Sequence, residues 1–174
     1  MLRERQTGPA TVIGIGFGAV VALELALADP DLVARAFVIE PPVFGALSEA
    51  TTGMSIDVDA IRAAAAEGGE EAAYDLFLGG ELQTLGCGAE RFSDKADRGP
   101  AAARSFLVEL PAVPAWPLDP VRLVTLEPEV TVVTLPSTPD LLKRAARAVV
   151  ERVPGAGSLH SSRDGIAAVA ALLA

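Results

Sequence analysis

The sequence predicts an α/β protein built on about four mostly parallel strands that are flanked by helices. A buried strand at Ala10 to Gly14 (ATVIG) runs through a glycine turn into an apolar helix at Phe17 to Ala28, and a second strand follows at Ala36 to Glu40. Another strand, Val130 to Thr134, precedes an amphipathic helix at Thr138 to Val153. A strand-helix-strand order implies parallel strands joined by a right-handed crossover.

The remaining elements are placed around this framework. Pro30 ends the first helix because proline cannot extend it. We expect further helices at Asp57 to Glu67, Glu70 to Leu78 and Ala101 to Glu109, a short strand at Gly157 to His160, and a closing helix at Asp164 to Leu173. The sequence thus predicts a single domain in three parts: a strand-helix-strand part at 1–44, a helical insert at 45–128, and a strand-helix part at 129–174.

Composition limits the classes of partner. The formal charge is -9, with no basic stripe to neutralise phosphates, so we expect neither nucleic acid nor an anionic membrane as a partner. Small molecules or proteins remain. One cysteine and one histidine provide no intrachain disulfide and no plausible zinc set, and we expect no metal and a reduced, cytoplasmic setting. The N-terminus shows no signal-peptide pattern, and its apolar run is too short to span a bilayer.

The glycine turn matches a dinucleotide-binding fingerprint. Gly14, Gly16 and Ala19 have the G-x-G-x-x-A spacing after a strand and at the start of a helix, and Glu40 ends the next strand, where a ribose-binding carboxylate would lie. However, the chain does not continue the strand-helix alternation that a dinucleotide domain needs. This interpretation is therefore the runner-up.

The order of elements along the chain resembles the α/β-hydrolase superfamily. The stretch GPATVIGIGFGAVVALELALADPDLVARAFVIEPPV is similar to its central strand, G-x-S-x-G elbow, buried helix and next strand, which ends in an acidic-Pro-Pro turn. The insert, with GGEEAAYDLFLGG, falls where small members carry a helical lid, and PEVTVVTLPSTPDLLKRAARAVVERVPGA is similar to their penultimate strand and following helix. The resemblance implies a partial α/β-hydrolase-like fold with a helical lid insert.

The resemblance also implies that the catalytic machinery is altered. Its nucleophile position is Gly16, which has no attacking atom and removes the strain of a positive φ. After the penultimate strand, Ser137 or Thr138 lies nearest the place of the catalytic acid, and Asp140 is displaced along the chain. Because some relatives carry the acid after the preceding strand, Glu40 is an alternative candidate.

His160 is the only candidate for the family's histidine. The short segment VPGAGSLHSSRDG leaves two alternatives: His160 lies in the histidine loop of a shortened strand, or it lies within the last strand and the loop is lost. Neighbouring serines are not held by a G-x-S-x-G motif, so they are not expected to be nucleophiles.

The part of the sequence before the elbow strand is short. Only nine residues precede Ala10, whereas the family carries about four strands there, together with the loop that forms half of the oxyanion hole. Of the groups that form the oxyanion hole, only the Phe17 amide is then present. The strand Ala10 to Gly14 then becomes a sheet edge, and we expect a homodimer through this edge, or a partner chain that supplies the missing N-terminal half.

Three functional hypotheses follow. The first is a non-hydrolytic protein, without a cofactor, that binds a small apolar molecule under the lid or serves as an accessory protein of a biosynthetic pathway. Its pocket would be lined by Gly16, Phe17, Phe44, Tyr74, Phe77 and Trp116. The second is a non-hydrolytic enzyme, such as a cyclase, isomerase or eliminating enzyme, that uses Glu40, Asp140 or His160 as acid or base, and the alanine-rich composition would suit an actinobacterial source. The third is the dinucleotide-binding module.

Overall fold

The computed structural model describes residues 8–84, 104, 107–108, 120–163 and 170–173. The elements in chain order are β1 (Ala10–Ile15), α2 (Phe17–Ala28), η1 (Pro30–Leu32), β2 (Val33–Ile39), η2 (Phe44–Ala46), α3 (Ser48–Thr84), α6 (Pro120–Leu123), β3 (Glu129–Thr134), α7 (Asp140–Arg152) and β4 (Gly157–His160). Residues 170–173 are also helical.

The described strands form one four-stranded sheet in the order β1-β2-β3-β4, and all three pairings are parallel. Gly14 pairs with Val38, Val38 with Val132, and Val132 with Ser158, so these residues share one face of the sheet. The predicted α/β class and the parallel sheet are confirmed. Within the described residues, β1 and β4 form its two edges.

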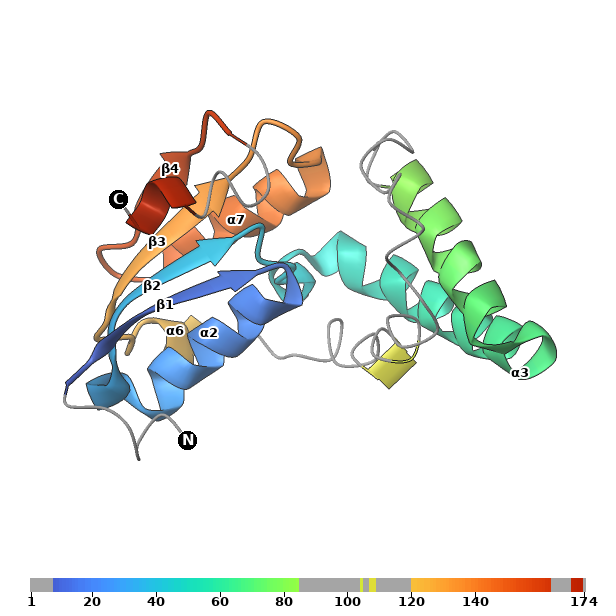
Figure 1. Ribbon diagram of the computed structural model, residues 1–174, viewed down its shortest axis with the longest axis horizontal. Helices are drawn as coiled ribbons and strands as arrows, with labels where there is room; N and C mark the ends of the chain where they lie inside the picture. The colour runs from blue at the N-terminus through green and yellow to red at the C-terminus, as the bar shows by residue number, and fades with distance from the viewer. Residues whose placement is uncertain (1–7, 85–103, 105–106, 109–119, 164–169, 174) are drawn as a thin grey trace.

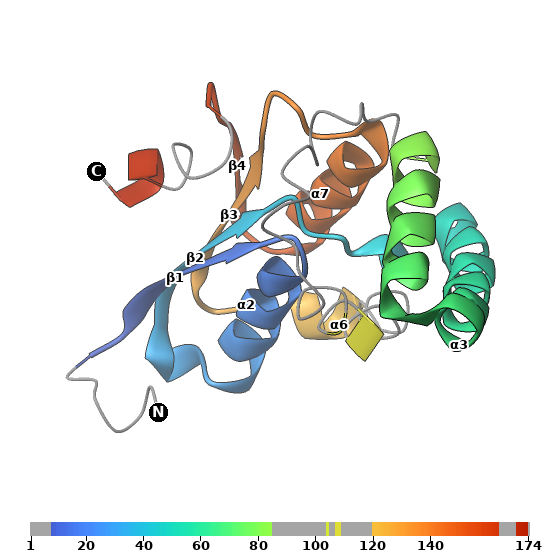
Figure 2. The same cartoon turned by 45° about the vertical axis from the view of Figure 1, so that its right-hand side comes forward.

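Helices α2, α6 and α7 cover one face of the sheet (Figures 1 and 2). This face contains the main core, because the strand residues that point toward the helices are small and apolar. Each fully buried valine or leucine contributes about 1.5–3 kcal/mol. The core includes Ala19, Leu23 and Ala26 of α2, Val38 of β2, Leu123 of α6, Val130 and Val132 of β3, and Ala146 and Val149 of α7.

The opposite face of the sheet carries a smaller apolar cluster. Ile39, Val133 and Leu135 are buried there, and Leu172 of the C-terminal helix packs against them. Toward the edge, this face is open, and Ile15 of β1 remains 51% exposed.

Two helical arms form α3, which lies beyond the carboxyl ends of β1 and β2 (Figures 1 and 2). The arms meet at Gly69, whose φ of 80° and ψ of -177° are not helical. Ile61 and Ala73, on opposite sides of this break, are both buried and pack with Phe77. The two helices predicted around this glycine pair are therefore present, and the first begins earlier than expected.

Several predicted boundaries shift by one to three residues, and two of these shifts have a visible local context. Strand β2 begins at Val33 rather than Ala36, and Arg35 within it lies 5.9 Å from the centre of the Phe37 ring. Helix α7 begins at Asp140 rather than Thr138, after Pro139 in extended conformation. Among the described residues, no helix is both long and apolar enough to cross a membrane.

A bidentate ion pair joins α2 to α6. The Arg122 guanidinium donates to the two carboxylate oxygens of Glu24, at 3.1 and 2.7 Å. Since both side chains are partly exposed, this pair contributes to the position of α6 more than to stability.

Candidate functional site at the carboxyl edge of the sheet

A tight turn joins β1 to α2 at the carboxyl edge of the sheet. Gly16 has φ 56° and ψ -124°, a conformation that residues with a Cβ rarely adopt. Its amide donates to the Ile39 carbonyl at 2.9 Å, and its own carbonyl accepts from the Ala19 amide at 2.9 Å. The backbone is thus fixed to β2 on one side and to the first turn of α2 on the other.

The tip of this turn carries no side chain. A Cβ placed on Gly16 would meet nothing within 4 Å, so the space above the turn is open. Helix α2 begins directly at Phe17, and the first amides of a helix have no partner within it. The polar groups that the turn presents are therefore backbone N–H groups at the positive end of a helix.

Gly14 holds the turn close to the helix. A Cβ on this residue would overlap the backbone of Gly18, and it would lie 2.7 Å from Ala19 Cα. Because glycine has only a hydrogen in place of a side chain, the end of β1 can contact the first turn of α2 directly. Without this approach, the sharp strand-to-helix turn would have to open.

Glu40 follows β2 and lies beside the glycine turn. It is the only described residue other than glycine with positive φ, at 49°, and its side chain is almost fully buried, with 5% exposed. Its amide donates to the Val133 carbonyl at 3.0 Å, which fixes the residue between β1 and β3. A strained, buried carboxylate at the end of a central strand is a feature often found at functional sites.

Thr138 is the partner of this carboxylate. Its hydroxyl donates to Glu40 Oε1 at 2.7 Å, and it accepts from the Leu135 amide at 2.6 Å. Thr138 is itself buried, with 3% exposed. Because the Leu135 amide occupies one lone pair of the hydroxyl, its proton is directed toward the carboxylate.

A comparison with protein-family models matches residues 1–172 to the alpha/beta hydrolase family. The chain belongs to this family. The glycine turn joins a strand to a helix, as the nucleophile elbow of this family does, and its central position 16 is glycine.

Solved structures with the same fold include an alpha/beta hydrolase from Sphaerobacter thermophilus DSM 20745, with a TM-score of 0.68 and 18% identity over 96% of this chain and 66% of that one. A hydrolase from Pseudomonas aeruginosa PA01 aligns with a TM-score of 0.63 and 19% identity over 97% of this chain and 62% of that one. MGS-M2, an alpha/beta hydrolase from a Medee basin deep-sea metagenome library, aligns with a TM-score of 0.60 and 16% identity over 92% of this chain and 59% of that one. The chain therefore spans less than two thirds of the length of these structures. No curated protein sequence matches the chain.

His160 is the last residue of β4. Of the two predicted positions, in the histidine loop or within the last strand, the structure therefore shows the second. Its Nδ1 lies 3.0 Å from Thr134 Oγ1, its cross-strand neighbour. Gly16 follows β1, at the other edge of the sheet, so three strand intervals of roughly 4.8 Å each separate the two, about 14 Å in all. His160 and Gly16 therefore lie at the ends of strands that are not neighbours in the sheet.

Asp140 lies apart from Glu40. It is the first residue of α7, and its side chain is 95% exposed. Its Oδ1 lies 3.2 Å from Lys143 Nζ one turn later on the same helix. The structure therefore joins Glu40 to Thr138 and leaves Asp140 on the surface.

The aromatic residues of the predicted pocket lie in different surroundings. Phe17 is half-buried at the start of α2, and Phe44 is buried in η2, which contacts α3. Tyr74 and Phe77 are half-buried in the second arm of α3. Trp116 lies outside the described residues. A pocket lined by these residues, with α3 as one wall, therefore stays a prediction.

The dinucleotide interpretation loses support from the sheet order. Dinucleotides bind in the crevice that forms where the strand order of a parallel sheet reverses. The described strands all lie on one side of β1, so they form no such reversal. In addition, the Gly16 amide is already paired with the Ile39 carbonyl. Within the described residues, no group of three or more His, Cys, Asp or Glu side chains could hold a metal ion.

The sequence places Thr138 near the position of the catalytic acid but does not predict its contact with Glu40. The signal was present in the sequence, because residues that follow neighbouring parallel strands meet at the same edge of a sheet. Glu40 follows β2 and Thr138 follows β3, and the pairing of these strands brings the two together.

Proposed function

We propose that this chain binds a small apolar molecule at the carboxyl edge of its sheet and does not hydrolyse it through the elbow. The observation that carries the proposal is Gly16. It keeps the elbow backbone, with φ 56° and ψ -124°, but offers no atom that could attack a carbonyl. The distance to His160 across four strands supports the same conclusion, because a general base must lie within hydrogen-bond reach.

The position of the insert supports a ligand site at this edge. Ligands of parallel α/β sheets bind outside the carboxyl ends of the strands. Helix α3 lies beyond those ends (Figure 1), and a Cβ on Gly16, at the same edge, would meet nothing within 4 Å. The amides at the N-terminus of α2 would orient a carbonyl or another polar group of the ligand.

A second candidate is a non-hydrolytic enzyme in which Glu40 acts as acid or base. The buried carboxylate beside the elbow, in a left-handed backbone conformation, favours it over Asp140, which is exposed. Shape and one proton-transferring group are enough for an isomerase or an eliminating enzyme.

We expect that 4-nitrophenyl butyrate is hydrolysed no faster in the presence of the purified chain than in buffer alone. The same sample should bind 2-octanone, which has no hydrolysable bond, with a saturable change in the fluorescence of Trp116, the only tryptophan. Ester turnover that disappears in a His160→Ala variant would contradict the proposal. Turnover that disappears only in Glu40→Gln would replace it with the second candidate.

We also propose that two copies of the chain pair through β1. In the described residues this strand pairs only with β2, so its outer backbone groups lack strand partners, and Ile15 exposes apolar surface at the edge. A two-fold pairing of β1 with itself would satisfy these groups and produce a continuous sheet.

Light scattering at micromolar concentration is expected to show a dimer. Ile15→Lys should shift the chain toward monomer, because a charge would lie at the edge. Val21→Lys is the matched control, since Val21 on α2 is similarly exposed, at 54% against 51% for Ile15. A stable monomer for the parent chain, or equal effects of the two variants, would exclude this interface.

A further inference from the structure

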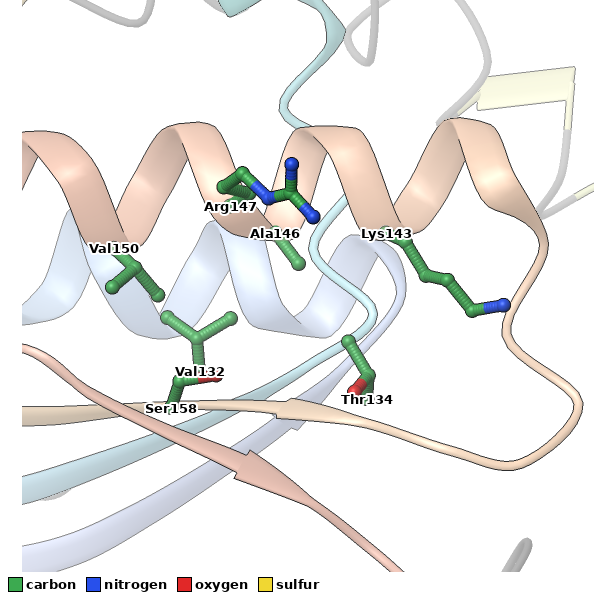
Figure 3. Close-up of a pocket in the computed structure, with 7 residues that line it drawn as sticks. All are labelled: Val132, Thr134, Lys143, Ala146, Arg147, Val150 and Ser158. Carbon is green, nitrogen blue, oxygen red and sulfur yellow. The ribbon is translucent and has the colours of Figure 1, made fainter.

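A hollow lies between α7 and the β3–β4 edge of the sheet, on the side of the helix away from the elbow (Figure 3). Its volume is about 240 Å³. Val132, Ala146 and Val150 provide its apolar walls, while Lys143, Arg147, Thr134 and Ser158 provide polar groups. It is several times larger than the ~30 Å³ that one water occupies in the liquid, so a small organic molecule fits.

Strand geometry explains why polar groups reach this hollow. Val132 pairs with Ser158 and Thr134 with His160, and alternate residues of a strand share a face. Thr134 and Ser158 therefore point toward α7, as Figure 3 shows. On the helix, Ala146 is too short to fill the space above β4, which leaves the gap open.

Two cationic side chains of α7 line the hollow. Lys143 and Arg147 are four residues apart on α7, so they lie on the same side of the helix, where like charges repel each other. Among the described residues, the Lys143 ammonium pairs with the exposed Asp140 at 3.2 Å, and an anion can replace such a surface pair at little cost. In the described part of the chain no carboxylate pairs with Arg147. Among the described residues, Asp140 is thus the carboxylate that pairs with this couple of cations, through Lys143.

The floor of the hollow adds neutral donors. The Ser158 hydroxyl has no hydrogen-bond partner among the described residues. Thr134 Oγ1 lies 3.0 Å from His160 Nδ1. When that nitrogen carries its proton, it donates to the threonine oxygen, and the threonine hydroxyl is then available to donate to a ligand.

We propose that this hollow binds a phosphate monoester. Such a group carries a charge of about -1.5 to -2 and three acceptor oxygens, which match two cations and two hydroxyl donors better than the two oxygens of a carboxylate do. Arginine suits it through two parallel N–H groups, and lysine through a point charge. The carbon substituent of the ester would pack on Val132 and Val150 at the apolar end. This site is separate from the elbow and does not depend on the function proposed for it.

The test uses His160 as its reporter. Because it is the only histidine, a chain without an affinity tag gives one set of imidazole signals in a proton NMR spectrum. We titrate the chain with ethyl phosphate, and separately with inorganic phosphate, at constant pH and ionic strength. Ethyl phosphate should shift these signals saturably, and it should bind more tightly than inorganic phosphate.

Variants of α7 decide whether the hollow is the site. Arg147→Gln should weaken ethyl phosphate binding by ~10-fold or more, since hydrogen bonds to charged groups are the strong ones. Arg144→Gln removes the same charge from the same helix outside the hollow, and it should leave binding nearly unchanged. No saturable shift at tens of millimolar, equal weakening by both variants, or equal affinity for the two phosphates would overturn the proposal.

Discussion

Gly14→Ala is expected to lower the free energy of unfolding by about 3 kcal/mol, at the upper end of the range for overpacked cores. The added methyl group would overlap the Gly18 backbone and lie 2.7 Å from Ala19 Cα. These neighbours are backbone atoms of α2, so no change of rotamer can move them away. Relief requires a shift of α2 against β1, which would open the elbow and disturb the core. Urea unfolding followed by circular dichroism measures this loss.

Gly18→Ala is the control for this prediction. A Cβ on Gly18 would meet nothing within 4 Å, and alanine is the better helix former by up to about 1 kcal/mol. This variant should therefore be as stable as the parent chain or slightly more stable. A Gly14→Ala chain that unfolds at the same urea concentration as Gly18→Ala would show that β1 and α2 do not approach each other as described.

Thr138→Val is expected to destabilise the chain by about 2–3 kcal/mol, because it leaves buried polar groups without partners. Valine has nearly the shape of threonine, so it opens no cavity. It removes the acceptor of the Leu135 amide and the donor to Glu40, whose carboxylate is 5% exposed. Denaturant unfolding at neutral pH measures the effect.

Thr138→Ser separates the hydroxyl from the methyl group. Serine keeps both hydrogen bonds and loses only one buried methyl, at about 1 kcal/mol. The valine variant should consequently lose at least twice as much stability as the serine variant. Equal losses would mean that packing, and not the contact with Glu40, is the role of Thr138.

The framework of the fold could be predicted because local signals agree with the tertiary structure. Helix α2 begins and ends where predicted, since the glycine turn and Pro30 limit it on both sides. Strand β2 was predicted too short because Arg35 interrupts its apolar run. In the structure this residue is exposed near the start of the strand, with its guanidinium near the Phe37 ring.

The candidate site could be predicted only in part. Gly16 and Glu40 lie close in sequence to recognisable strand ends, so local patterns alone are enough to predict them as site residues. The contact between Glu40 and Thr138 joins residues 98 apart, across the whole insert, and depends on how β2 pairs with β3. The hollow beside α7 depends on side chains from β3, β4 and α7 that no local pattern relates.

Helix α7 illustrates the same limit. Leu141 and Leu142, two of its large apolar residues, are only half-buried. Ala145, Ala146, Ala148 and Val149 are the buried residues, because the helix lies close to the sheet and small side chains allow this approach. Periodicity predicted the side of the helix, and the tertiary contact selected which residues on it are covered.

The central claim is that the elbow of this alpha/beta hydrolase family member has no attacking atom. It is tested most directly by the intact mass of the purified chain after incubation with a fluorophosphonate, a reagent that labels activated serines. The account predicts an unmodified mass, because position 16 is glycine and His160 lies about three strands away, at the opposite edge of the sheet. A stoichiometric adduct that disappears in the His160→Ala variant would contradict it.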